Sequence, residues 1–225
     1  MMGKDHLWYG LSAGAACALL AATGHLPHSV GPWPLAVAPP GPIDAAWLIG
    51  ASALGSLAPD FDEPGSMISN APRLTGNLAR RLLKRVGIGP LAPLAWLLGW
   101  VILVVAGGLN ALSRLCSSLF RFLALGHREG SHWLPVWLAA SAGVYALTVA
   151  RLGVWPGAGF ALGFLTHLLA DGLTKAGLPL VPNTGARLHL LPRPLRIRTG
   201  SAGETVVTVL YTVALSALVA ATVVG

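Results

Sequence analysis

Six long apolar runs constrain what this chain of 225 residues can fold into, and they lie at about 7–23, 44–59, 91–110, 133–150, 154–173 and 205–224. A transmembrane helix needs about 20 mostly apolar residues, and these runs reach or approach that length. Only 10% of the residues are charged, whereas a soluble domain carries about a quarter. The sequence therefore predicts an all-α fold, a polytopic transmembrane helical bundle that forms a single integral membrane domain over residues 1–225.

A seventh apolar run, at about 112–126, is shorter and contains Arg114 and Arg121. It is interpreted either as a tilted span or as a helix that lies in the membrane interface. The bundle is therefore predicted to have about six to seven spans. We expect residues 91–126 to cross the membrane twice as a helical hairpin. A single crossing would place the basic loop before this segment and the basic loop near the C-terminus on opposite faces of the membrane.

Two loops hold ten of the fifteen lysines and arginines and predict the orientation of the chain: Arg73, Arg80, Arg81, Lys84 and Arg85, then Lys175, Arg187, Arg193, Arg196 and Arg198. Basic residues concentrate in cytoplasmic loops, so both loops and the N-terminus are expected on the cytoplasmic side. These topology signals account for most of the basic residues behind the net charge of +7, so no nucleic-acid partner is expected. The first apolar run lacks a clear processing site, and we expect it to be retained.

His167 and Asp171 place two ionisable side chains inside the run at 154–173. Such groups cost at least about 2.5 kcal/mol at membrane depth, so they usually face the protein interior and serve a function there. On a helix, residues four apart lie on the same face, where they can share one metal ion or one proton. The alternative is a buried hydrogen bond that packs two helices.

Two further clusters contain side chains that bind metals. Asp60 and Asp62 offer carboxylates that suit hard or borderline cations, although Asp, Pro, Gly and Ser also favour a plain polar turn. His127 and His132 offer imidazoles that suit Zn, Mn or Fe, and Arg128 between them suits an anionic group such as phosphate. The alternative for this second cluster is a polar loop in which Arg128 serves only topology.

His6 precedes the first run, so a fourth segment contributes a metal-binding side chain. In the predicted topology His6, the Asp60 cluster, the His127 cluster and the His167/Asp171 pair all fall at the cytoplasmic ends of spans. This alignment predicts one polar site at the cytoplasmic face of the bundle. Glu204 opens the last run, where an acid suits the positive end of a helix dipole.

Three segments together resemble the YdjM-like inner-membrane proteins, which are described as metal-dependent hydrolases. These are Leu57 to Ser66, His127 to His132, and Gly163 to Leu180, whose sequence GFLTHLLADGLTKAGLPL is the most specific of the three. The resemblance covers most of residues 6–204 and includes His6. It implies a bacterial inner membrane protein with hydrolytic activity. By motif matching, it also implies that the functional residues are Asp60, Asp62, Ser66, His127, Arg128, His132, His167 and Asp171.

Two departures from that family pattern are visible in the chain. Glu129 adds an acid to the second motif, and Trp133 follows His132 where the family has a hydroxyl side chain. Residues 91–126 also look like an insertion relative to shorter members. A hairpin that crosses twice would leave both flanking motifs on one face, in agreement with the topology argued from the basic loops.

The function predicted from the sequence is a membrane-bound metal-dependent hydrolase of an ester or phosphoester in a lipid-like substrate. Its partners would be membrane lipids, and its cofactor one or two divalent ions, with Zn or Mn favoured. The predicted metal ligands are His6, Asp60, His127, His132, His167 and Asp171, and the predicted catalytic residues are Asp62, Arg128 and Glu129. The alternatives are a non-enzymatic membrane protein that uses metal as a structural clamp or transports it, and a scaffold that recruits partners through its basic loops.

Overall fold

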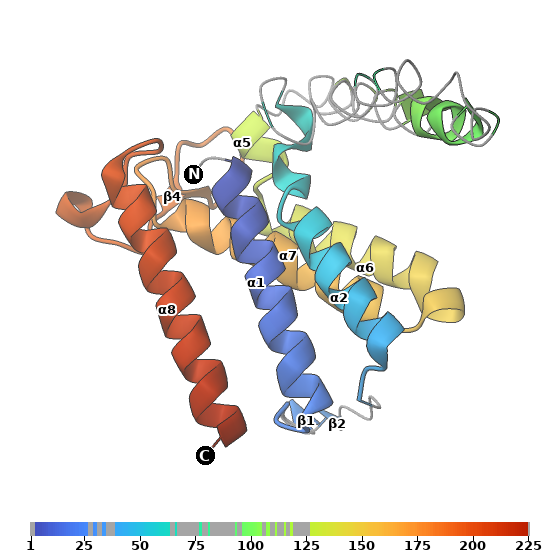
Figure 1. Cartoon of the computed structure of the whole chain (residues 1–225). Helices are drawn as coiled ribbons and strands as arrows, with labels where there is room; N and C mark the ends of the chain where they lie inside the picture. The colour runs from blue at the N-terminus through green and yellow to red at the C-terminus, as the bar shows by residue number, and fades with distance from the viewer. Residues whose placement is uncertain are drawn as a thin grey trace. The chain divides into compact units, whose positions relative to one another are not determined.

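The computed structural model describes residues 3–26, 29–30, 33–34, 39–63, 66 and 127–224, with scattered positions between 77 and 118. This part of the chain is mostly helical, as predicted (Figure 1). Six α-helices are described: α1 (Gly3–Ala22), α2 (Pro42–Gly55), α5 (His127–Gly130), α6 (Leu134–Leu152), α7 (Trp155–Gly172) and α8 (Ala202–Val224). Two short 3-10 helices, η1 (Ala58–Asp62) and η2 (Arg193–Leu195), complete the helical elements.

Four two-residue strands form two antiparallel pairs, which the prediction of an all-α fold did not include. Strand β1 (Ser29–Val30) pairs with β2 (Trp33–Pro34), and β3 (Leu178–Pro179) pairs with β4 (Arg187–Leu188). In the second pair Leu178 lies opposite Leu188. Both pairs lie in connections between helices, so they leave the helical architecture unchanged.

Contacts between Cα atoms divide the chain into two compact units. The first contains residues 1–59 and 132–225, and with them α1, α2, α6, α7 and α8. The second contains residues 60–131, and with them α5 and the whole of the predicted hairpin at 91–126. A single membrane domain with an inserted hairpin stays a prediction, because much of residues 91–126 lies outside the described part of the chain.

Two of the described helices, α6 and α8, are long and apolar enough to cross a membrane. Helix α2 has 14 residues, which gives it a length of about 21 Å, less than the roughly 30 Å of a hydrocarbon core. Helices α1 and α7 each include ionisable side chains, among them His6 and Asp171. Of the six to seven spans predicted from the sequence, these two candidates are therefore supported, and the others stay predictions.

Proline and glycine set the helix boundaries within the first unit. Pro42, at the start of α2, has a fixed φ angle that suits the first helical turn, and Asp44 accepts a hydrogen bond from the Gly41 amide at 3.2 Å. Helix α6 ends at Gly153, whose φ of 78° is a left-handed conformation that glycine adopts readily. Helix α7 begins two residues later, with Pro156 in its first turn.

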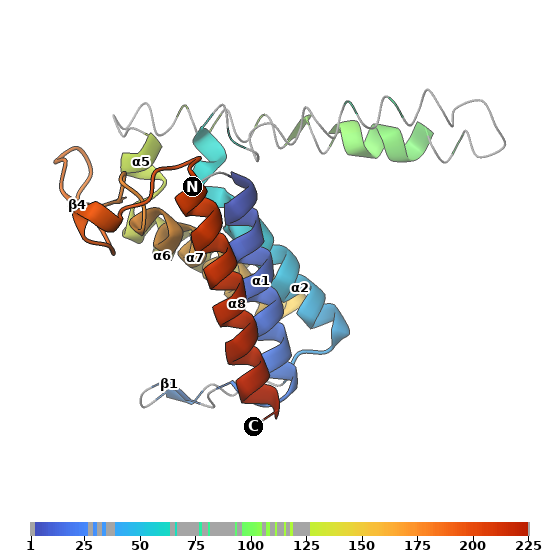
Figure 2. The ribbon, with the colours of Figure 1, turned by 60° about the vertical axis from the view of Figure 1, so that its left-hand side comes forward.

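Small residues allow α1, α2 and α7 to pack very closely. A Cβ atom at Gly163 or Gly159 would overlap the backbone carbonyl of Ser52 or Leu48 in α2, and one at Gly10 would overlap Ser56. The Ser52 hydroxyl also donates a 2.7 Å hydrogen bond to the Gly10 carbonyl. Helix α1 lies between α2 and α8 in both views (Figures 1 and 2). This packing brings the beginning of α1 and the ends of α2 and α7 together.

The second basic segment, between α7 and α8, folds back over the end of α7. The Leu190 amide donates to the Gly172 carbonyl at 2.8 Å, and the Ile197 amide donates to the Leu173 carbonyl at 3.0 Å. Ile197 is buried with Tyr9 and Ala170. The segment therefore satisfies backbone groups at the C-terminus of α7 and covers the end of the helix that contains Asp171.

Candidate metal site

Three histidines and one aspartate meet inside the first unit, and all four side chains are at most 1% exposed. His6 lies in the first turns of α1, and His132 lies in the turn that precedes α6. His167 and Asp171 lie one turn apart near the end of α7. Residues separated by up to 165 positions in the sequence (6 to 171) therefore share one buried site.

Three donor atoms of this cluster form a compact triangle. The Nε2 atoms of His132 and His167 are 3.1 Å apart. The Oδ2 atom of Asp171 lies 3.3 Å from Nε2 of His132 and 4.0 Å from Nε2 of His167. The i, i+4 spacing on α7 thus places both side chains on one face, as the sequence predicts.

A backbone hydrogen bond fixes the orientation of the His167 ring. The Nδ1–H group of His167 donates to the carbonyl oxygen of Ser56 at 2.7 Å. A carbonyl can only accept, so in the neutral imidazole the proton is on Nδ1 and the lone pair is on Nε2. That lone pair belongs to the nitrogen that lies nearest His132 and Asp171. Histidine ligands of protein metal sites are held in the same way by a second hydrogen bond.

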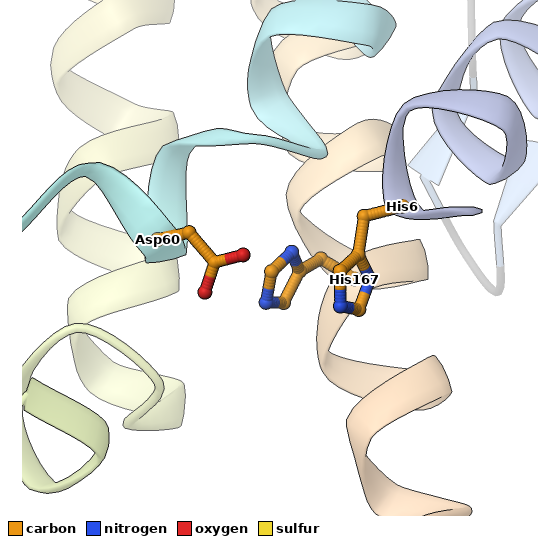
Figure 3. A group of neighbouring side chains, drawn as sticks. All are labelled: His6, Asp60 and His167. Carbon is orange, nitrogen blue, oxygen red and sulfur yellow. The ribbon is translucent and has the colours of Figure 1, made fainter. Parts of the chain in front are cut away.

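His6 adds a fourth donor atom on the other side of the carboxylate. Its Nε2 atom is 3.6 Å from Oδ1 of Asp171. Its ring stacks on that of His167, with 3.7 Å between centroids and 15° between planes, and Figure 3 shows these side chains extending from α1 and α7. The two oxygens of Asp171 therefore face different histidines, Oδ1 facing His6 and Oδ2 facing His132.

The donor atoms fit a divalent metal ion. The ligand atoms of His132, His167 and Asp171 all lie within 4.8 Å of one another. Zinc binds nitrogen and oxygen at about 2.0–2.2 Å in a tetrahedron, which separates its ligand atoms by about 3.3–3.6 Å. The separations of 3.1, 3.3 and 4.0 Å in the cluster bracket that value. Two imidazoles and a carboxylate are a ligand set suited to Zn, Mn or Fe.

The other predicted ligands and catalytic residues belong to the second unit. Asp60, which Figure 3 also labels, is the first residue of that unit, and Glu129 lies in α5. Their roles stay predictions. The side chains of Asp62, His127 and Arg128 lie outside the described residues, so the same holds for them.

Ser56 and Ser52 were not identified as site residues from the sequence. Both are fully buried, and Ser56 contributes through its backbone carbonyl, which no side-chain motif reveals. A signal was nevertheless present, because small residues recur at a spacing of four in three segments: Gly10 and Gly14, Ser52 and Ser56, and Gly159 and Gly163. This small-xxx-small spacing indicates closely packed membrane helices.

Glu204, interpreted from sequence as an acid at a helix start, is also a buried group at 2% exposure. Its side chain accepts a hydrogen bond from the Gly200 amide at 2.5 Å and lies close to Asp5, the neighbour of His6. Asp5 precedes the apolar run that begins at residue 7. Burial raises the pKa of the Asp5 carboxyl, and the contact with Glu204 raises it further. The starts of α1 and α8 therefore lie beside each other, next to the site.

The comparisons with known proteins give one match. The sequence model of the family described as YdjM inner membrane protein matches residues 1–224. No curated protein and no solved structure matches the chain. The match confirms the resemblance noted in the three motifs and extends it to nearly the whole sequence.

Proposed function

The chain belongs to the YdjM inner membrane protein family, and from this membership and the buried His/Asp cluster we propose that it is a membrane-bound metal-dependent hydrolase. Its substrate would be an ester or phosphoester of a lipid-like molecule, which reaches the site from the membrane interface. The metal would be zinc or manganese. The Asp171 carboxylate has His6 beside one oxygen and His132 beside the other. A carboxylate in this position can bind one metal ion or bridge two.

The residues have separate roles in this proposal. His132, His167 and Asp171 hold the metal, and His6 serves as a further ligand on the Oδ1 side of Asp171. A bound divalent ion supplies a Lewis acid that polarises the scissile group and lowers the pKa of water. Asp62 and Glu129 are the candidate general bases, and Arg128 is the candidate group that binds an anionic substrate.

One observation carries the proposal: the hydrogen bond from His167 to the Ser56 carbonyl. A histidine that only packs two helices makes the same kind of hydrogen bond, but it does not need further metal-binding atoms beside its other ring nitrogen. Here the tautomer is fixed, and the Nε2 atom of His167 lies 3.1 Å from Nε2 of His132 and 4.0 Å from Oδ2 of Asp171. This is the geometry expected for a ligand whose orientation is set before the ion binds.

A metal clamp that joins helices is the second candidate function, and the burial of the cluster favours it. Structural metal sites are closed, whereas catalytic sites keep a position for water or substrate. The four side chains are 0–1% exposed, which suits a closed site. A transporter is less well supported, because its ligands are expected near the bilayer midplane with access from both faces.

An activity assay on the whole chain tests the proposal. The protein would be purified in detergent, stripped with a chelator and supplied with zinc or manganese before hydrolysis of phospholipids, isoprenoid phosphates and generic phosphoesters is measured. Hydrolysis that disappears with the chelator and returns with the metal supports the hydrolase. A protein that binds metal and hydrolyses none of these substrates supports the clamp.

A further inference from the structure

The β3–β4 hairpin, between α7 and α8, has one face made of leucines. Leu178 and Leu188 are partners across the two strands, and the Leu180 amide continues the pairing with a 3.0 Å hydrogen bond to the Ala186 carbonyl. Alternate residues of a strand point to the same face, as do residues that lie opposite each other on paired strands. Leu178 is 4% exposed, whereas Leu180 and Leu188 are 53% and 40% exposed. The leucine face therefore begins in the core and continues onto the surface.

The residues on either side of Leu188 are polar. Arg187 and His189 alternate with it in sequence, so they point to the opposite face of the hairpin. The His189 ring lies there against the backbone, with Nε2 3.2 Å from the Lys175 carbonyl oxygen. Such alternation is typical of a strand pair that lies between an apolar and a polar environment.

The hairpin is attached to a helix that is long and apolar enough to span a membrane. Trp133, which directly precedes α6, donates a 3.0 Å hydrogen bond from Nε1 to the Leu180 carbonyl. Leu178 is buried in a cluster against which Trp137 of α6 packs. Both α6 and α8 are candidate membrane spans, and the segment between α7 and α8 contacts the start of α6 and leads into the start of α8. The leucine face therefore lies where a membrane surface would meet the protein, a level at which tryptophan is common.

The same segment is basic and contains no acid between positions 172 and 203. The acids that flank it, Asp171 and Glu204, are at most 2% exposed. Three of its basic residues are exposed: Lys175, Arg193 and Arg198. The surface that this segment presents is therefore positively charged.

The end of α7 holds the basic residues beside the hairpin. The side chains of Leu178 and Leu190 both lie against Gly172, the last residue of α7. The Ile197 amide donates to the Leu173 carbonyl at 3.0 Å. Arg193 and Arg198 belong to the stretch fixed by these contacts, and Figure 1 shows the stretch at the end of the first unit where α1 and α8 begin.

We propose that this hairpin lies on an anionic membrane surface, with Leu180 and Leu188 among the lipid acyl chains and Arg193 and Arg198 at the lipid phosphates. Exposed leucines are stabilised when they leave water, and basic residues beside a membrane attract anionic lipids. An acidic protein or a nucleic acid would use the charges but leave the leucine face in water. The surface needs neither a metal nor hydrolysis, so it stands independently of the function proposed above.

Fluorescence quenching of the full chain in lipid nanodiscs tests the membrane contact. In a parent with Cys17 and Cys116 replaced, Leu188→Cys carries an NBD label, and lipids with a nitroxide on the acyl chain act as quenchers. His189→Cys is the matched control, because it is the next residue and faces the other side of the strand. Quenching should be at least about threefold stronger for Leu188→Cys than for His189→Cys.

Equal quenching of the two labels would overturn the membrane contact. Leu180→Cys reports on the same face and should behave like Leu188→Cys. A melting temperature equal to the parent's confirms that each labelled variant is folded.

The anionic headgroup is tested with the label on Leu188→Cys and the same nitroxide chain on phosphatidylglycerol or phosphatidylcholine at equal low fractions. Phosphatidylglycerol should quench about threefold more strongly. The double variant Arg193→Gln/Arg198→Gln should remove this difference, whereas Arg151→Gln should keep it. Arg151 is a matched control because it is exposed in the last turn of α6, outside the basic segment. Equal quenching by both lipids in the parent would overturn the anionic lipid, and a label that neither lipid quenches would assign the surface to a soluble acidic partner.

Discussion

His167 donates a hydrogen bond from Nδ1 to the backbone carbonyl of Ser56, 111 residues earlier in the chain, at 2.7 Å. The bond joins the end of α2 to α7 and leaves the Nε2 lone pair of His167 for the cluster. It exists because the glycines of α7 let the two helices approach closely. The geometry of the candidate metal site therefore depends on helix packing as well as on the ligands.

Gly163→Ala tests this dependence. A Cβ at this position overlaps the Ser52 carbonyl, so α2 and α7 must separate. Overpacking of this kind costs about 1–3 kcal/mol, and we expect a lower melting temperature together with a weaker affinity for metal. Thermal unfolding in detergent and a metal titration measure the two effects.

Gly143→Ala is the matched control for that substitution. Gly143 is also helical, but a Cβ there meets no atom within 4 Å. Alanine has a higher helix propensity than glycine by up to about 1 kcal/mol, so this variant should be as stable as the parent or slightly more stable. If both variants behaved alike, the close contact of α2 with α7 would not matter to the site.

Asp171→Asn separates the hydrolase from the clamp. The amide keeps the shape of the side chain but loses the charge that binds a metal or accepts a proton. In a hydrolase this change should lower turnover by about 100-fold or more, with a smaller effect on stability. In a clamp it should mainly lower the melting temperature, because the metal contributes its binding free energy to the folded state alone.

The comparison needs turnover and melting temperature measured on the same preparations. A large loss of turnover with a melting temperature near that of the parent supports the catalytic reading. The clamp is the better account if the parent has no hydrolytic activity and the variant loses its metal and melts at a lower temperature.

The sequence predicted most helix positions to within a few residues. The apolar run at 154–173 corresponds to α7 at Trp155–Gly172, and the run at 133–150 corresponds to α6 at Leu134–Leu152. These boundaries could be predicted because Pro135, Gly153 and Pro156 act through their own backbone preferences, which do not depend on distant contacts. The placement of His167 and Asp171 on one helix face could also be predicted, because it depends only on helix periodicity.

Convergence of His6 and His132 on the His167/Asp171 pair was expected from the alignment of the motifs, but the individual contacts that hold these distant segments together were not predicted. The Ser56 carbonyl is a backbone acceptor, and the stack of His6 on His167 requires α1 to pack against α7. The segment that contains Lys175 to Arg198 was interpreted only as a basic loop. In the structure Ile197 is buried there, and backbone hydrogen bonds tie the segment to the end of α7. None of these contacts follows from local sequence preference.

The topology can be tested by labelling single cysteines in a parent in which Cys17 and Cys116 are replaced. A cysteine at Gly185, between β3 and β4, should resist a membrane-impermeant thiol reagent added to intact cells, because the basic segment is predicted to be cytoplasmic. A cysteine at His25, just after α1, should be labelled. Labelling at Gly185 from outside would overturn the predicted orientation and the alignment of the motifs on one face.

Metal analysis of the detergent-purified protein tests the central claim most directly. The parent should contain one or two divalent ions per chain after exposure to zinc or manganese and removal of the excess. His167→Ala should lose that metal, because it removes a donor from the triangle with His132 and Asp171. His25→Ala should retain it, since His25 is exposed and contacts Thr23. A parent without metal, or a His167→Ala protein that binds as much as the parent, would contradict the account.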